Sequence, residues 1–269
     1  PYYLSYYNMV SDGGQQPTEG IWFYIENAFE NGAMGCITDD EVNEIILDKF
    51  KDKVIIKVKD TVKALQEIAK YKRSLYDIPV IAVTGSVGKT STKDMVASVL
   101  EKHYNVLKTE GNFNNEIGLP LTAFRLGSDN DIAVFEMGMS AFGEISRLTR
   151  IAVPETAIIT NIGFSHIEHL GSRENILKAK LEILEGIPSG GTVILNGDDP
   201  FLNSVVGTLP FETLTYGIEN QSCDVVAFNI KKSAEGTEFE VKIEEEIYKV
   251  QVNVPGLHHV YNALSAILT

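Results

Sequence analysis

The chain has 269 residues and a formal net charge of −14 at pH 7. So acidic a composition excludes a general surface for duplex nucleic acid, because phosphate backbones attract clustered Lys and Arg. Its two cysteines, Cys36 and Cys223, are too few for a disulfide framework or a cysteine-rich zinc site, and no apolar run approaches the roughly 20 residues of a membrane span. We therefore predict a cytoplasmic monomer with no nucleic-acid partner and no membrane span.

The first part of the chain combines short strand-like and helix-like patterns. "NAFENGAMGCIT" and "DKVIIKVKD" contain strand-like runs, and "TVKALQEIAKYKRSL" has the pattern of a helix. Pro79 disfavours helix at the residue before it, which places a boundary close to this proline. We therefore predict a small N-terminal α/β domain over residues 1–77 and a second domain over residues 78–269.

In residues 78–269, apolar strand-like runs alternate with helix-like runs. The strand-like runs are "PVIAVTG", "DIAVFEMG", "ETAIITNIG" and "GTVILNG". They are too continuously apolar to have a solvated face, which indicates a mostly parallel central sheet with helices on both faces. After Phe211 the strands are shorter and alternate with polar residues, which predicts an antiparallel extension. The chain starts without Met and "NALSAILT" breaks off inside a helical pattern, so we expect a fragment of a longer protein.

A glycine-containing turn follows the first of these strands. In Gly85-Ser86-Val87-Gly88-Lys89-Thr90, the two glycines allow backbone N–H groups to face an anion at the start of the next helix. Lys89 would reach the outer phosphates of a nucleotide and Thr90 would ligate Mg²⁺. Val83 stands where the usual pattern has a glycine, so the match covers G-x-x-G-K-T only. The pattern predicts a P-loop NTPase-like fold; the alternative is an ordinary turn with a solvated lysine.

Three further candidates stand at the ends of predicted strands, where ligands bind in open parallel sheets. Glu136 closes the apolar run "IAVFE", and a carboxylate there needs a partner or a cation unless it lies exposed at the rim. Asn161 and His166 follow the next strand. Histidine is a common ligand and also a common structural residue, so both readings of His166 stay open.

Lys180 lies within the apolar stripe of a helix predicted over Arg173–Glu185. A lysine that faces the core needs to be paired, neutralised or modified, unless its ammonium reaches the rim. Lys178 differs, because Glu174 and Glu182 at i−4 and i+4 are typical of a solvated, ion-paired face.

With these residues in place, the sequence resembles the Mur ligases, and within that family it is most similar to the MurF type. The resemblance runs in order from about Val58 to the end. It rests on "DTVKALQEIAKYKR", "VIAVTGSVGKTSTKDM", "EGNFNNEIGLPLT", "VFEMGMSAFGEISRLTRIAVPETAIITNIGFSHIEHLGSRENILKAKLEI", "LNGDDP" and "VPGLHHVYNAL". Two parts of the family pattern are missing: the usual motifs of the N-terminal domain, and the C-terminal domain that brings the amine substrate.

The resemblance implies roles for the matching residues. ATP would be bound by Gly85, Ser86, Val87, Gly88, Lys89, Thr90, Ser91 and Asn262. The catalytic residues would be Lys89, His166 and Lys180. Two Mg²⁺ ions would be held by Thr90, Glu136, His166 and Lys180, with Lys180 as a carbamate. The substrate side of the cleft would be ordered by Asn114, Asn115 and Asn161.

The resemblance also implies an activity: ATP-dependent addition of D-alanyl-D-alanine to UDP-N-acetylmuramoyl tripeptide through an acyl phosphate, in peptidoglycan synthesis. Without its C-terminal domain, this chain is expected to ligate poorly or not at all. One alternative is a related ligase that joins a different amine to a different carboxylate, since the start of the chain departs from the family. A second is a P-loop kinase or switch NTPase, which has no use for a carbamylated lysine.

Overall fold

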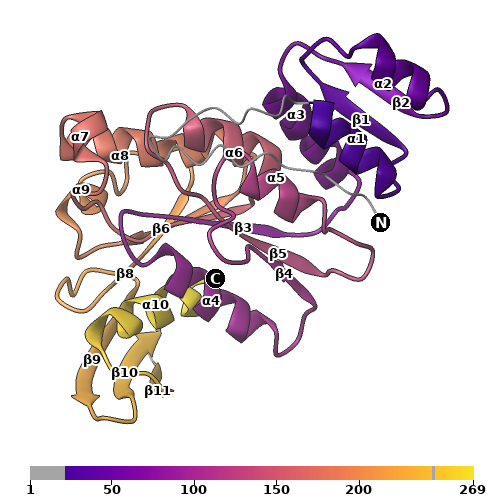
Figure 1. Cartoon of the computed structure of the whole chain (residues 1–269). Helices are drawn as coiled ribbons and strands as arrows, with labels where there is room; N and C mark the ends of the chain where they lie inside the picture. Colours follow the sequence, from indigo (N-terminus) through magenta and orange to yellow (C-terminus); the bar gives the residue numbers. More distant parts are fainter. Residues whose placement is uncertain (1–21, 244–245) are drawn as a thin grey trace. The chain divides into compact units, whose positions relative to one another are not determined.

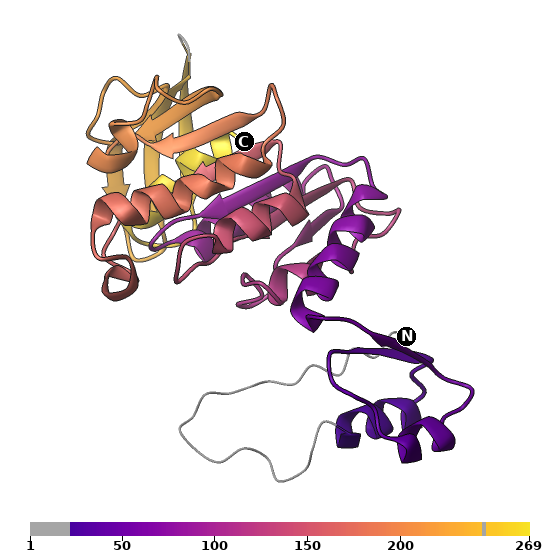
Figure 2. The same cartoon turned by 90° about the horizontal axis from the view of Figure 1, so that it is seen from above.

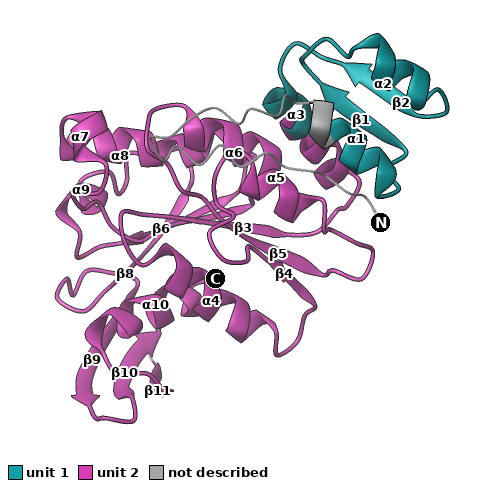
Figure 3. Cartoon of the chain, viewed as in Figure 1, with its two compact units in different colours: residues 1–65 teal, residues 66–269 magenta. Residues whose placement is uncertain are grey.

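The computed structural model describes residues 22–243 and 246–269, and the chain divides into two compact units, residues 1–65 and 66–269 (Figure 3). The division falls inside helix α3 (Thr61–Ser74) and not at the expected boundary near residue 77. Arg73 accounts for part of this shift, because its buried guanidinium donates to the carbonyl oxygens of Ala152, Tyr76 and Ile78 in the second unit. Residues 1–21 of the predicted first domain lie outside the described residues.

In the first unit, two parallel strands pack against two helices. These elements are α1 (Trp22–Glu30), β1 (Gly35–Thr38), α2 (Glu44–Lys49) and β2 (Val54–Lys57). The core that they share contains Ile25, Ala28, Phe29, Ala33 and Ile46. The small α/β arrangement expected for this segment is therefore present in its described part.

One nine-stranded sheet organises the described part of the second unit, with the strand order β11-β10-β9-β8-β7-β6-β3-β5-β4. Its strands are β3 (Val80–Thr84), β4 (Val106–Lys108), β5 (Ile132–Glu136), β6 (Thr156–Ile159), β7 (Thr192–Asn196), β8 (Glu212–Gly217), β9 (Val225–Lys232), β10 (Thr237–Ile243) and β11 (Glu246–Val252). All neighbours from β4 to β9 pair in parallel. The predicted α/β fold with a mostly parallel sheet is confirmed.

The antiparallel extension is shorter than predicted. Among the described strands, the antiparallel pairs are β9 with β10 and β10 with β11, whereas β8 pairs in parallel with both β7 and β9. The strands β8 and β9 overlap at just two residue pairs, Tyr216 with Val225 and Gly217 with Val226. The start of β9 pairs with the end of β8. The two strands can therefore be parallel neighbours although no helix connects them.

Helices cover both faces of this sheet, as Figures 1 and 2 show. The helices of the second unit are α4 (Lys89–Leu100), α5 (Gly118–Ala123), α6 (Glu144–Ala152), α7 (Ile167–Leu170), α8 (Arg173–Leu181), the 3₁₀ helix η1 (Glu182–Gly186), α9 (Pro200–Asn203) and α10 (Leu257–Ile267). One core lies under α4 and α10, and the other under α5, α6, α8 and η1. Successive side chains of β3 enter opposite cores, with Val80 and Ala82 in one and Ile81 and Val83 in the other.

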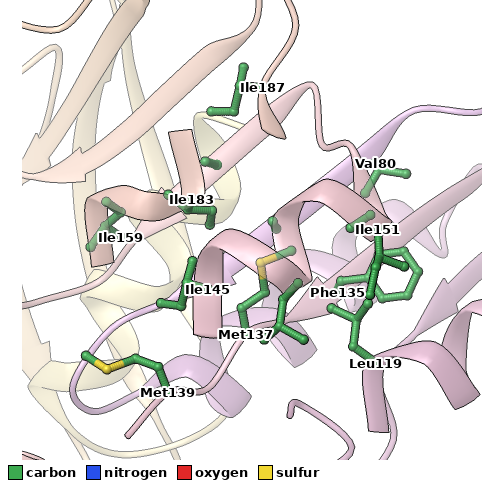
Figure 4. Close-up of a cluster of buried hydrophobic side chains, with 14 of the residues drawn as sticks. Val80, Leu119, Phe135, Met137, Met139, Ile145, Ile151, Ile159, Ile183 and Ile187 are labelled. Atoms are coloured by element: carbon green, nitrogen blue, oxygen red, sulfur yellow. The ribbon is translucent and has the colours of Figure 1, made fainter. Parts of the chain in front are cut away.

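Figure 4 shows part of the second of these cores. Phe135 from β5, Ile145 and Ile151 from α6, and Ile183 from η1 meet there with exposed fractions of 3% or less. These buried contacts hold α6 and η1 against β5. No helix in the described ranges 22–243 and 246–269 has the length and apolar character needed to cross a bilayer.

The order of the strands also locates a site. From β3 the chain moves outward to β4, returns to β5 beside β3, and then crosses to β6 on the other side of β3. This reversal is a topological switch point, and ligands of open α/β sheets bind outside the carboxyl ends of the strands at such a point. The loops that follow β3, β5 and β6 therefore surround the expected site.

At the end of β7, the carboxylate of Asp198 joins three parts of the second unit. It accepts the N–H groups of Ile218, Glu219 and Asn220, and the hydroxyl of Tyr261 on α10 donates to it at 2.8 Å. Burial alone would raise the pKa of Asp198, but these donors outweigh burial and lower the pKa below its ordinary value of 3.8.

Replacing Asp198 with Asn should lower the free energy of unfolding by about 2 kcal/mol at pH 7, because hydrogen bonds to a charged group are lost. The folded-state pKa lies below the unfolded one, so this stability is present above about pH 4 and is lost as the pH falls through the folded-state pKa. Urea unfolding at several pH values measures this difference. Asp129→Asn, in an exposed turn, is the control and should change stability by less than about 0.5 kcal/mol. Equal effects of the two substitutions, or a difference that does not shrink at low pH, would contradict the assignment.

Candidate functional site

Residues 85–91, here called the phosphate loop, leave β3 and enter α4. Gly88 is the N-cap of α4 with φ of +82°, and the first helical hydrogen bond runs from Thr92 N–H to Gly88 O. Since the four N–H groups at the start of a helix have no acceptor within it, those of residues 88–91 are available to an anion. Gly85 also has to be a glycine: its φ is +154°, and a Cβ there would lie 1.9 Å from Thr160 Oγ1.

Lys89 folds back over this loop. Its Nζ donates to Gly85 O at 2.9 Å. Burial lowers the pKa of Lys89, while the nearby carboxylate of Glu136 acts in the opposite direction. The ammonium therefore lies between the loop backbone and an acidic group, where phosphate oxygens would complete its coordination.

Glu136 ends β5 and is almost fully buried, with 1% of its surface exposed. Its Oε1 accepts a hydrogen bond from Asn114 Nδ2 at 2.7 Å, but its Oε2 has no hydrogen-bond partner among the described residues. Buried carboxylate oxygens nearly always have a partner, because desolvation without one is costly. The alternative of an exposed rim carboxylate is therefore wrong, and the free oxygen fits a cation ligand.

Polar groups around Glu136 fix its backbone and its carboxylate. Thr109 Oγ1 accepts the N–H of Glu136 at 3.0 Å, and the buried Lys93 donates to Thr109 O at 2.7 Å. Asn114 O accepts the N–H of Gly138 at 2.8 Å, which holds Asn114 against the end of β5. The sequence analysis missed Lys93 and Thr109; the signal for Lys93 was a lysine four residues after Lys89, on the same face of α4.

Two of the predicted asparagines are engaged with the protein itself. Asn115 Oδ1 accepts the N–H groups of Ile117 and Gly118 at the start of α5. Asn161 forms hydrogen bonds to Val87 in the phosphate loop. Asn114, the third, binds Glu136 and so lies at the candidate cation site. None of these contacts tests the predicted role of the three residues in substrate binding.

His166 and Lys180 are both affected by the charge of Lys89 in the phosphate loop. His166 has a positive φ of 64°, unusual for a residue other than glycine, and forms the N-cap of α7. Partial burial lowers the pKa of His166, and the positive charges of Lys180 and Lys89 lower it further. The imidazole is therefore favoured in its neutral form, which can act as a metal ligand.

Lys180 is buried in the last turn of α8, with an exposed fraction of 2%. Burial, and secondarily the charge of Lys89, lower the pKa of Lys180 from 10.5 to about 7. No ion pair of Lys180 occurs among the described residues. The position thus favours neutralisation or modification over an ammonium that extends to solvent.

The helix that carries Lys180 is shorter than predicted. It ends at Leu181 and not at Glu185, and the 3₁₀ helix η1 follows directly. Glu182 was expected on a solvated face with Lys178, but both of its carboxylate oxygens accept N–H groups at the start of α6, from Gly143 and Ser146. The change from α-helix to 3₁₀ helix after Leu181 thus coincides with the contact between Glu182 and the start of α6.

Asn262 is buried in α10 beside the start of α4. Its Oδ1 accepts the hydroxyl of Thr92 at 3.0 Å, and its Nδ2 has no partner among the described residues. A Cβ at Gly88 would lie 3.9 Å from Asn262 Oδ1, so the amide is next to the phosphate loop. Its free N–H groups could serve a bound nucleotide.

Two residues that the sequence analysis missed hold the loop between β6 and α7. Asp199 accepts the N–H of Ile162 at 2.8 Å while it caps α9, and Arg173 Nε donates to Ile162 O at 3.1 Å. The Arg173 guanidinium also makes cation–π contacts with the rings of Phe164 and Phe201, at 5.0 and 4.3 Å from their centroids. "DDP" is a helix N-cap signal, but nothing in the sequence shows that its carboxylate reaches Ile162.

The site as a whole combines one buried carboxylate with two lysines, a histidine and the N-terminus of α4. This arrangement suits a polyanion with a bound divalent cation. Residues 22–243 and 246–269 contain no group of three or more His, Cys, Asp or Glu side chains placed to hold a metal by themselves. A cation bound to Glu136 would therefore need further oxygen ligands from Thr90, water or a phosphate.

Comparisons with known proteins agree with this geometry. The family described as Mur ligase middle domain matches residues 83–269. The chain is 44% identical over 244 residues to the UDP-N-acetylmuramoyl-tripeptide–D-alanyl-D-alanine ligase of Bacillus subtilis, covering 91% of this chain and 51% of that protein. For the enzyme of the same name in Escherichia coli, the identity is 39% over 78% of this chain and 46% of that protein. The chain thus spans about half the length of these relatives.

Solved structures show the same likeness. MurF from Acinetobacter baumannii has a TM-score of 0.83 and 30% identity, covering 91% of this chain and 52% of that chain. MurF ligase from Thermotoga maritima in complex with ADP has a TM-score of 0.81 and 30% identity, covering 91% of this chain and 56% of that chain. These matches agree with the site at the switch point of the sheet and with the buried Glu136. This chain belongs to the Mur ligase family.

Proposed function

We propose that the protein acts as the ATP-dependent ligase that joins D-alanyl-D-alanine to UDP-N-acetylmuramoyl tripeptide. The observation that carries this proposal is the position of Glu136 beside Lys89: its buried Oε2 has no hydrogen-bond partner in the part of the chain that the structure describes. The names of the relatives supply the substrates, and the complex of a relative with ADP supports a nucleotide at this loop.

In this proposal, the N–H groups of residues 88–91 and the ammonium of Lys89 bind the phosphates of ATP. The terminal carboxylate of the tripeptide attacks the γ-phosphorus, the bond to the β-γ bridging oxygen breaks, and ADP leaves. The amine of the second substrate then attacks the acyl carbon, expels phosphate and loses a proton. Lys89 offsets the repulsion between the carboxylate and the triphosphate, which is otherwise a large part of the barrier.

Two Mg²⁺ ions belong to the same proposal. Thr90 and Glu136 would hold the first, and His166 and a carbamate on Lys180 would hold the second. When bound, the ions neutralise the negative charge that develops on the transferred phosphoryl group. The free oxygen of Glu136 supports the first site, and the burial of Lys180 beside His166 supports the second. A carbamate would convert a buried cation into an anion that a metal can balance.

The test of the function is ADP release by the full-length protein with UDP-N-acetylmuramoyl tripeptide and D-alanyl-D-alanine. We expect turnover that requires both substrates, and a loss of at least about 10²-fold in kcat for Lys89→Ala without loss of the fold by circular dichroism. Lys102→Ala, in a solvated turn after α4, is the matched control and should retain full activity.

Two outcomes of this assay would count against the proposal. No turnover with this pair, but turnover with another carboxylate and amine, would favour a related ligase with different substrates. Phosphorylation of a hydroxyl compound, with no need for an amine, would favour a kinase.

Lys180→Met should stabilise the protein in CO₂-free buffer without metal. The pKa of Lys180 is about 7 in the folded state, and its ordinary value is 10.5. The lysine therefore destabilises the folded state at every pH at which its amine is protonated in the unfolded chain. This penalty is absent above pH 10.5, grows as the pH falls and reaches about 4 kcal/mol near pH 7. The free energy of unfolding, measured in urea from pH 6 to pH 10.5, should show a gain for Lys180→Met that shrinks with rising pH.

The same position should be needed for activity. Lys180→Ala is expected to lose most of the turnover, and acetate or formate should restore part of it by supplying the missing carboxylate. Lys178→Ala, two residues earlier on α8, serves as the control. Full activity of Lys180→Ala without added acid would contradict the carbamate.

A further inference from the structure

The side chain of Asn161 binds both backbone groups of a single residue of the phosphate loop, Val87. Asn161 Oδ1 accepts the N–H of Val87 at 3.0 Å, and Asn161 Nδ2 donates to Val87 O at 2.9 Å. Nδ2 also donates to Thr160 Oγ1 at 3.2 Å. Both N–H groups of this amide are therefore in use within the protein, although the resemblance to Mur ligases implied that Asn161 faces the substrate.

Neighbouring groups strengthen the same connection. Ser86 N–H donates to the main-chain oxygen of Asn161 at 3.0 Å, and Thr160 Oγ1 donates to Val87 O at 2.7 Å. The N–H of Gly163 donates to Ser86 Oγ at 2.8 Å. The segment that leaves β6 thus holds the first half of the phosphate loop through side chains and backbone together.

The segment that carries Asn161 is itself held on its other side. Asp199 binds the N–H of Ile162, and Arg173 binds its carbonyl oxygen. Asn161 is therefore fixed from both directions, by β6 before it and by these two contacts after it. A hydrogen-bonding group that is fixed in this way can impose a geometry on the loop that it touches.

The connection determines which donors a phosphate can use. Because the N–H of Val87 is paired with Asn161, it is not available to an anion, and the N–H groups of residues 88–91 remain. The backbone of Val87 is held in place before the nucleotide binds. Less conformational entropy is therefore lost on binding, which is how a pre-organised site gains affinity. We propose that Asn161 is a positioning residue that holds the phosphate loop in its nucleotide-binding conformation. This inference rests on the nucleotide binding in the proposed function and does not depend on the identity of the carboxylate or the amine.

The first test is the hydrogen–deuterium exchange of backbone amides in the wild-type protein and in Asn161→Leu, which removes the side-chain amide and keeps the number and branching of the side-chain heavy atoms. The Val87 amide should exchange at least tenfold faster in the variant, whereas the Ser86 amide should keep its protection because it binds the main-chain oxygen of Asn161. Asn130→Leu is the control, since Asn130 Oδ1 accepts the N–H of Gly127 in a turn before β5.

The second test is the affinity for Mg²⁺-ADP, measured by calorimetry without any other substrate. Asn161→Leu should raise the Kd at least tenfold and Asn130→Leu should leave it unchanged. If Asn161→Leu does not fold, Thr160→Val and Thr160→Ser address the same connection. The hydroxyl that binds Val87 O is lost in the first and kept in the second, so only Thr160→Val should weaken ADP binding.

The possible outcomes separate the inference from the function. If wild-type protein binds ADP and Asn161→Leu binds it equally well, with an unchanged Val87 amide, the inference is wrong. A rise in the KM of the carboxylate substrate alone would likewise overturn it and assign Asn161 to direct substrate contact. If the wild-type protein does not bind ADP, both the proposed function and the inference fail.

Discussion

A carboxylate at the end of a buried parallel strand has to be balanced by its surroundings, and the candidate site is arranged around this requirement. Glu136 uses one oxygen to accept a hydrogen bond from Asn114, and its other oxygen has no partner within residues 22–243 and 246–269. Thr109, itself held by Lys93, fixes the backbone of Glu136. Such an oxygen is costly to maintain unless a cation completes it, because buried polar groups are otherwise satisfied.

The positively charged groups of the site are also unfavourable to bury without a partner of opposite charge. Burial lowers the pKa of both Lys89 and Lys180, and the charge of Lys89 lowers the pKa of Lys180 further. His166 is affected by both lysines. Bound phosphates would offset the cost of burying the charge of Lys89, and modification of Lys180 would remove its positive charge. These pKa shifts are of the kind expected at a functional site, where burial and like charges are brought together.

The hydrophobic pattern was sufficient to predict much of the fold. The apolar runs around β3, β5, β6 and β7 indicated parallel strands, and the glycines after β3 indicated the phosphate loop. The direction of β9 was not predictable, because it depends on a two-residue overlap with β8 and not on the composition of the strand. The short edge strand β4 was missed for a related reason: three residues are too few to show periodicity.

The site residues, too, could be predicted only where the sequence pattern itself marks them. Lys89 could be chosen from the glycine-containing turn, and Glu136 and Lys180 because a charge within an apolar pattern is conspicuous in the sequence. The contacts of Asn115, Asn161 and Glu182 could not be predicted, because each depends on a backbone group far away in the chain or on a local turn. Side chains that serve the backbone have no periodic signal, which is why sequence patterns identify charged groups better than the residues that hold them in place.

The central claim is that the free oxygen of Glu136 helps to bind a divalent cation together with a nucleotide at the phosphate loop. Electron paramagnetic resonance of Mn²⁺, titrated into the protein with and without ADP, tests it most directly. We expect tight binding of Mn²⁺ only when ADP is present, and at least a tenfold weaker affinity in Glu136→Gln, which keeps the shape of the side chain and removes its charge. Equal Mn²⁺ affinity of Glu136→Gln and the wild-type protein in the presence of ADP would contradict the account.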